Sequence, residues 1–379
     1  AVAFLVLETT GSPARMGLVL FCSIFPAMLL GIVAGAVIDR HNPKHIIVLA
    51  DLSRGLIVAA LAAAFAMERL EFTHLLLAQT LISVCTAFFD PAIPAMLPKL
   101  MDREALTRAN AQTQLIGGIA TIAGPALGGM TVAWGGYLTV FLINAASYLL
   151  SGAFESFIHL PSARAGAESH TKVGEDIRTG CRYIARRKEL VVILGIVGVI
   201  HFFVGAVEAI IPVMAAGLGG DGAANMGFLQ TSFGLGTVVA GLFIGTRTIT
   251  TTERHLLFGS VFAIGLLLLS MGTLTAFGLA PLIALLALFF GVGCAVICAG
   301  TSFRSILQQT VALEMLGRVF GFVSSVGNIS IPAAVLVAGV ALTHCPPHCL
   351  LIVSGTCLLP LTIGGHRLYS LHASTRRPD

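Results

Sequence analysis

The sequence predicts an all-α polytopic membrane protein built from two pseudo-symmetric six-helix bundles, with the first of about twelve transmembrane helices truncated. Three observations lead to this prediction: the composition, the length of the apolar runs, and an internal repeat. The chain is 56% hydrophobic and only 11% charged, with a mean hydropathy of +0.93, whereas a soluble domain carries roughly 25% charged residues. The net charge of +4 is spread over the loops, so we expect a lipid bilayer and no nucleic acid as partner.

The apolar runs predict the helices in order along the chain. Residues 1–7 are too few to span a bilayer, and we interpret them as the outer end of a helix whose beginning precedes the sequence. A charged turn at 35–45, which contains Pro43, then separates the first two full spans. Hydropathy and helix breakers place the spans near residues 15–38, 46–67, 72–96, 106–133, 137–158, 189–216, 225–245, 255–277, 280–303, 312–342 and 347–366.

A long polar stretch at 160–188 divides the apolar chain into two parts. It predicts a first six-helix bundle at 1–158, a central cytoplasmic linker at 159–188, and a second bundle with a short tail at 189–379. Several residues recur 210 positions later, in the loop and fifth helix of each bundle: Leu97 and Leu307, Glu104 and Glu314, Leu106 and Leu316, Arg108 and Arg318, Gly129 and Gly339. We therefore favour a duplication, and parallel repeats are typical of one large class of secondary transporters.

The basic residues are distributed unequally between the two sides of the predicted membrane. Alternate loops place 20 of the 22 Lys and Arg residues on one side and only Arg15 and Arg69 on the other. Because cytoplasmic loops carry the excess of positive charge, the richer side is cytoplasmic. The linker and the C-terminus are then also expected in the cytoplasm.

The turn between the first two full spans carries a recognisable motif. Its pattern Gly35-x-x-x-Asp39-Arg40-x-x-Pro43-Lys44 resembles the signature of the major facilitator superfamily, with one additional residue. A branch containing enterobactin exporters and macrolide efflux proteins is similar in several further segments: 7–13, Asp51–Arg54, Phe89–Ala92, Leu97–Pro98 and Gly317–Phe320. The resemblance covers the whole chain and implies a multi-pass secondary transporter of the bacterial inner membrane, acting as a monomer without a cofactor.

The same resemblance implies a function. The implied activity is proton-coupled export of an amphipathic small molecule, such as a siderophore or a macrolide-like drug, by rocker-switch alternating access. An importer or a lysophospholipid flippase on the same fold is the alternative. The chain has no Gly-x4-Gly-Lys-Ser/Thr motif for ATP and no convergent catalytic cluster, so an enzyme is not expected.

Two sets of residues are candidates for gating. Gly35, Asp39, Arg40 and Lys44 of the turn, with Asp51 and Arg54 on one face of the next helix, predict a charge network at the cytoplasmic side. A second set, Gly124-Pro125-Ala126-Leu127-Gly128-Gly129, resembles the antiporter motif of drug exporters. Pro125 bends the helix, and the small residues give a flat face for a neighbour, for which Gly241 and Gly245 are candidates; ordinary close packing is the alternative. Departures from the family pattern are Ala120, the missing acid before Arg247, and a fourth helix without arginine.

Ionisable groups at membrane depth are costly unless paired or hydrated, so each is a functional candidate. We expect Glu208 to carry protons, with a structural acid as the alternative, and His201 to be a packing residue. Asp90 is the second candidate for proton coupling; it either caps a helix break or lines the inner mouth of the cavity. Candidates for the substrate cavity are Glu8, Gln79, Gln114, Asn144 and Asn328, although contact between helices explains any single one of the amides.

The outer loop His344-Cys345-Pro346-Pro347-His348-Cys349 contains two possible metal-ligand pairs. Its spacing differs from ordinary zinc sites, which separate a Cys pair from a His pair. A disulfide or free thiols are therefore favoured here over a metal ion, and no metal site is predicted.

Overall fold

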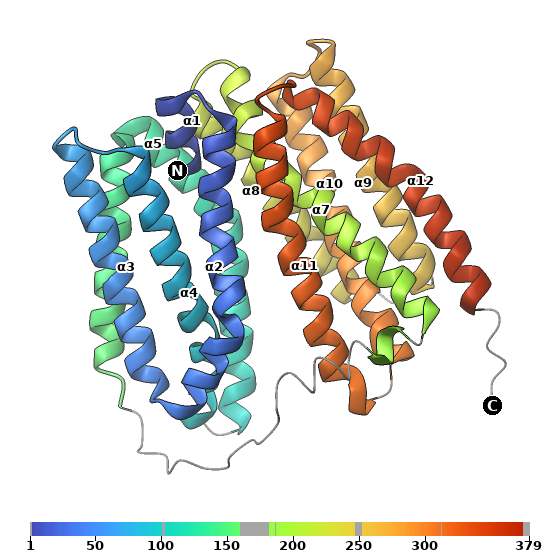
Figure 1. The fold of residues 1–379 in the computed structure, drawn as a ribbon, viewed down its shortest axis with the longest axis horizontal. Coiled ribbons are helices and arrows are strands. Elements are labelled where there is room, and N and C mark those ends of the chain that lie inside the picture. The colour runs from blue at the N-terminus through green and yellow to red at the C-terminus, as the bar shows by residue number, and fades with distance from the viewer. Residues whose placement is uncertain are drawn as a thin grey trace. The chain divides into compact units, whose positions relative to one another are not determined.

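The computed structural model describes residues 2–100, 103–159, 182–185, 187–246, 252–311 and 313–373, and these residues are almost entirely helical (Figure 1). Within these ranges there is no β-strand, and nine helices are long and apolar enough to cross a membrane. Many large apolar side chains on them are exposed, which suits helices that face lipid. The predicted all-α polytopic membrane fold is thus confirmed.

The chain divides into two compact units, of which the first comprises residues 1–168. Its helices are α1 (Val2–Thr10), α2 (Pro13–Arg40), α3 (Pro43–Ala66), α4 (Phe72–Leu100) and α5 (Arg103–Ser156). Helix α2 packs along α4, and α3 packs against both α4 and α5. Helices α2 and α3 each begin with a side-chain cap that is followed by a proline. Ser12 accepts a hydrogen bond from the backbone N–H of Arg15 at 3.3 Å, and Asn42 accepts one from the backbone N–H of Lys44 at 3.0 Å.

Helix α5 contains two helices that meet at Gly136. This glycine has φ 72° and ψ 176°, a conformation that interrupts the helix and that side-chain-bearing residues rarely adopt. The two spans predicted at 106–133 and 137–158 are therefore present on either side of the break.

The second unit comprises residues 169–379. Its helices are α7 (Lys188–Gly217), α8 (Gly222–Thr246), α9 (Glu253–Ala276), α10 (Leu282–Thr310), α11 (Leu313–Ala341) and α12 (Pro347–Ala373). Helix α8 packs along α10, α9 packs against α10 and α12, and α7 packs against α11, α12 and α8. The pairing of α8 with α10 corresponds to that of α2 with α4 in the first unit.

The internal repeat is visible in the turns as well as in the helices. Helices α9 and α10 begin and end 210 residues after α3 and α4. The turns that follow α3 and α9 each have one residue with positive φ, Glu68 at 57° and Gly278 at 67°. Three backbone hydrogen bonds close both turns in the same pattern: Met67 to Ala63, Glu68 to Phe65 and Arg69 to Ala64, and Phe277 to Thr273, Gly278 to Thr275 and Leu279 to Leu274.

Two helices extend beyond their predicted ends. Helix α10, predicted to end near residue 303, continues to Thr310, and α12, predicted to end near 366, continues to Ala373. In α10 the extension is held by packing, since Ile306 and Leu307 are buried. The polar residues Arg304, Gln308 and Gln309 of this extension lie on an exposed side of the same helix.

Candidate functional site

A buried ion pair lies in the first unit, on helix α3. Arg54 donates from Nη1 to Oδ1 of Asp51 at 3.0 Å, and the two residues are only 5% and 2% exposed. The spacing of three residues predicted this pairing. The Arg54 guanidinium also lies 4.4 Å from the ring centroid of Phe89 on α4 and 5.6 Å from that of Tyr148 on α5. A charge held by both a carboxylate and two aromatic rings is fixed at one position between three helices.

Two polar residues that were not predicted as site residues lie near the same pair. Tyr148 contacts Arg54 through its ring, and the Glu155 carboxyl is under the electrostatic influence of Asp51 and Arg54. Ser151 donates to Oε1 of Glu155 at 3.3 Å. Tyr148, Ser151 and Glu155 are three and four residues apart and so share one helix face. That polar stripe in an apolar span was the signal that could have identified them.

Asp90 lies on α4 next to Phe89, and its side chain is exposed. Helix α4 continues through Asp90 and Pro91 to Leu100, so the predicted alternative of a cap at a helix break is wrong. Arg54 acts electrostatically on Asp90 as well. The pair on α3 is thus the centre of a cluster that includes Asp90, Tyr148 and Glu155.

The turn between α2 and α3, predicted to be cytoplasmic, is described only in part. Lys44 is partly buried and lies in the first turn of α3, where its backbone N–H donates to the Asn42 cap. A Cβ added at Gly35 would meet no atom within 4 Å. The side chains of Asp39 and Arg40 lie outside the described residues, so their predicted contribution to the charge network stays a prediction.

Glu208 is the candidate acid of the second unit, on helix α7. Its side chain is exposed, although Val207, Ala209 and Ile210 beside it are 7%, 0% and 0% exposed. Within the described part of the chain, no cation or hydrogen-bond donor contacts its carboxylate. His201 lies earlier on α7, and its ring is hydrogen-bonded within the helix, since its Nδ1 lies 2.8 Å from the carbonyl oxygen of Val197. Glu208 is therefore an accessible acid in a wall of buried apolar residues.

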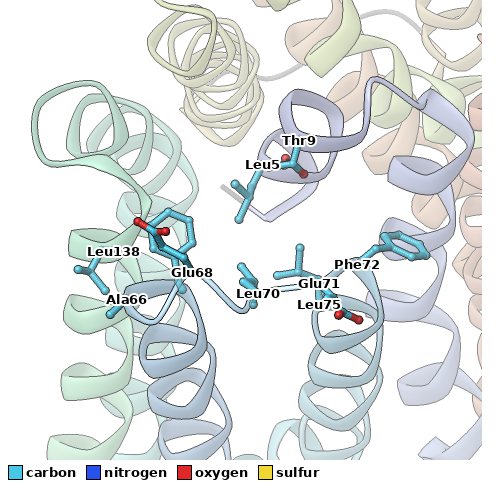
Figure 2. A pocket seen from close by; sticks show the side chains of 10 residues that line it. Leu5, Thr9, Ala66, Glu68, Leu70, Glu71, Phe72, Leu75 and Leu138 are labelled. Carbon is cyan, nitrogen blue, oxygen red and sulfur yellow. The ribbon is translucent and has the colours of Figure 1, made fainter.

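A cavity of about 450 Å³ opens at the end of the first unit where α3 is joined to α4, between α1, α3, α4 and α5 (Figure 2). Leu5 and Thr9 of α1 face Leu70, Glu71 and Leu75 across it, and Glu68 lies at its edge. Glu8, predicted to face a substrate cavity, does not line this one. It accepts a hydrogen bond from the Tyr137 hydroxyl, which ties α1 to α5 just after the Gly136 break. The cavity wall is mostly apolar, and its acids come from the loop between α3 and α4.

The glycine-proline motif lies in the first part of α5, and Pro125 is inside the helix. A Cβ added at Gly124 or Gly128 would meet no atom within 4 Å, and the same is true of Gly245 on α8. Gly129 is buried. The glycines therefore leave an unobstructed face on α5, and its predicted contact with α8 stays a prediction.

The neutral polar candidates are distributed rather than gathered. Gln79 on α4 is partly buried and Asn144 on α5 is exposed. The side chains of Gln114 and Asn328 lie outside the described residues. Cys345 and Cys349 carry free thiols, so the alternative of a loop disulfide is not found. Across the described ranges, no three His, Cys, Asp or Glu side chains are grouped as metal ligands would be.

Comparison with known proteins assigns the family. A family model described as Major Facilitator Superfamily matches residues 1–335. The chain belongs to the major facilitator superfamily. It is 24% identical to macrolide efflux protein A of Streptococcus pyogenes over 375 residues, which cover 96% of this chain and 89% of that protein. It is also 24% identical over 362 residues to the multidrug efflux pump Tap of Mycolicibacterium fortuitum, covering 89% of this chain and 83% of the pump.

Solved structures agree with the superfamily fold. The crystal structure of the nucleoside transporter NupG matches with a TM-score of 0.76 over 97% of this chain and 93% of that one, at 14% identity. At such low identity the match describes the fold alone. This superfamily member is thus a multi-pass membrane transporter with efflux pumps among its relatives.

The turn that carries the superfamily signature gives a first prediction. We expect Asp39→Asn to reduce transport while the protein still inserts into the membrane, because it removes one charge from the predicted cytoplasmic network without changing side-chain size. The measurement is transport rate per inserted protein, determined in membranes with matched expression. Wild-type transport under those conditions would exclude a gating role for Asp39.

Proposed function

We propose that this transporter is a proton-coupled exporter of amphipathic small molecules, such as a macrolide-like drug or a siderophore. It would exchange protons for substrate by rocker-switch alternating access, as a monomer in the bacterial inner membrane, with its C-terminus in the cytoplasm. Asp39, Arg40, Lys44 and the Asp51–Arg54 pair would stabilise one state at the cytoplasmic side.

The observation that carries this proposal is the accessible carboxylate of Glu208 at membrane depth. An acid without a cation among the described residues is costly in a membrane and is retained where it binds a proton or a substrate. Similarity to efflux proteins over most of the chain supports export rather than import.

The test uses everted membrane vesicles with an imposed pH gradient and three probes: a macrolide, a catecholate siderophore and a cationic dye. For export, we expect gradient-dependent uptake of at least one probe, which collapses when the gradient is dissipated. Glu208→Gln is expected to abolish the dependence on the gradient, because the amide cannot bind a proton. Asp221→Asn is the matched control, since Asp221 only caps α8 through a bond to the Ala224 N–H and asparagine can do the same.

Two outcomes would contradict the proposal. Uptake that is unchanged in Glu208→Gln would remove Glu208 as the proton carrier. Accumulation in right-side-out vesicles, with none in everted ones, would favour the importer on the same fold.

A further inference from the structure

Helix pairs α3 and α5 in the first unit and α9 and α12 in the second have the same register. A Cβ added at Gly55 would meet Leu149 Cδ2 at 2.7 Å, and one added at Gly265 would meet Leu359 Cδ2 at 3.2 Å. Gly265 lies 210 positions after Gly55, and Leu359 lies 210 positions after Leu149. Residues 210 apart in these helices therefore occupy equivalent positions in the two units.

Because of this equivalence, each residue of the charged cluster can be compared with the residue at the same position in the second unit. Asp51 and Arg54 correspond to Val261 and Ile264, and Tyr148 corresponds to Leu358; these three apolar residues are all 0% exposed. Glu155 corresponds to Gly365, which packs against Ile196 and Phe258. The second unit thus builds the same helix packing with apolar residues at these positions. The charges of the first unit are not needed for this packing.

The charges within the cluster do not balance when every acid is ionised. Arg54 neutralises Asp51, and the Glu155 carboxyl and the exposed Asp90 are further acids under the electrostatic influence of Arg54. Two polar atoms in the cluster are buried without a hydrogen-bond partner among the described residues, Nε of Arg54 and Oε2 of Glu155. Burying an unpaired charge is far more costly than burying a neutral carboxylic acid. The arrangement is thus suited to an acid that holds a proton.

We propose that Glu155, together with the Asp51–Arg54 pair, forms a proton-binding site in the first unit. The proposal rests on the proposed proton coupling and adds a site to it on the unit that does not contain Glu208. Proton binding converts the Glu155 carboxylate to a neutral acid, and release returns one proton and restores the negative charge on Glu155. Arg54 is the group that senses this charge, because it already contacts Asp51, Phe89 and Tyr148 on three helices.

Other titratable groups surround this site and belong to its electrostatics. Asp51 and Arg54 on α3 act electrostatically on Glu155, and Tyr148 precedes it on α5. From α4, Asp90 and Cys85 act on Tyr148, and Asp90 is also influenced by Arg54. Ser151 is a positioning residue, since it donates to Oε1 of the Glu155 carboxyl.

Infrared difference spectroscopy of the purified transporter at two pH values tests the site without any substrate. We expect a carbonyl stretching band of a protonated carboxylic acid that is lost in Glu155→Gln and retained in Asp221→Asn. Ser151→Ala keeps the carboxyl and removes its donor, so it should shift the band to higher frequency. A band that neither Glu155→Gln nor Ser151→Ala alters would overturn the proposal. If Glu155→Gln does not fold, the band of Ser151→Ala alone is the test, and an unshifted band overturns the proposal.

Transport in vesicles gives the functional readout with a macrolide as probe. Glu155→Gln is expected to lose uptake driven by the pH gradient and to retain movement of macrolide down its own gradient. Wild-type dependence on the pH gradient in this variant would overturn the site. If the wild-type protein moves no macrolide, the export proposal fails for that probe, and the infrared band still decides whether Glu155 binds a proton.

Discussion

Arg54→Ile is expected to destabilise the transporter by about 3–5 kcal/mol and to abolish transport, because it leaves Asp51 as an uncompensated buried charge. Asp51 is only 2% exposed, and Arg54 provides the one cation that contacts it among the described residues. The same substitution removes the contacts with Phe89 and Tyr148 that join α3 to α4 and α5. The measurement is thermal unfolding of the purified protein in detergent, together with vesicle transport at matched protein content.

The second unit supplies the control for this substitution. Val261 and Ile264 occupy the equivalent positions there, so the double variant Asp51→Val/Arg54→Ile introduces a combination that this helix packing already accommodates. We expect it to recover most of the lost stability, since replacing both partners of a buried ion pair by apolar residues is often neutral or stabilising. Transport should not recover with it. Equal unfolding temperatures of the single and double variants would show that the pair does not act as a unit.

Gly293→Ala is expected to destabilise the second unit by about 1–3 kcal/mol, because helices α8 and α10 contact each other backbone to backbone at this point. An added Cβ would lie well inside van der Waals contact with the carbonyl oxygen of Phe233 and 3.1 Å from the backbone nitrogen of Thr237. Gly236 on α8 has the reciprocal clash with the carbonyl oxygen of Phe290. Neither helix can relieve such a clash by moving a side chain, so the two helices must separate.

Gly300→Ala on the same helix is the matched control. A Cβ there meets no atom within 4 Å, and alanine favours a helix over glycine by roughly 0.8–1 kcal/mol. Gly300→Ala should therefore be neutral or slightly stabilising, and the difference between the variants isolates the clash. The measurements are the yield of monodisperse protein and its unfolding temperature in detergent. If both variants unfold at the same temperature, the close approach of α8 and α10 does not contribute to stability.

The two units share one helix packing, but the first has a charged cluster where the second has apolar residues. A duplicated bundle needs its helix packing twice, but it needs an ionisable cluster only where protons or gating charges act. The apolar counterpart in the second unit shows which features of the first belong to the scaffold. Glu208 on α7 and the Asp51–Arg54–Glu155 cluster would then be two separate places at which protons act on this transporter.

The sequence by itself determined the helices and their order. A bilayer requires about 20 apolar residues per span and satisfied backbone groups, so hydropathy, proline and glycine mark the spans and their ends with little ambiguity. The Gly136 break and the separation of the two units by a polar stretch could be read in the same way. The Asp51–Arg54 pair was predictable too, because residues three apart on a helix are neighbours whatever surrounds them.

Only the tertiary structure decided which residues from different helices meet. Glu155 was not among the predicted site residues, and its place near Asp51 and Arg54 depends on how α5 packs on α3. The same packing decides that Gly293 touches backbone and Gly300 touches nothing, although both are glycines of one apolar helix. The physical reason is that hydropathy along the chain records contact with lipid, whereas the direction in which each side chain points is set by rotation and register between helices.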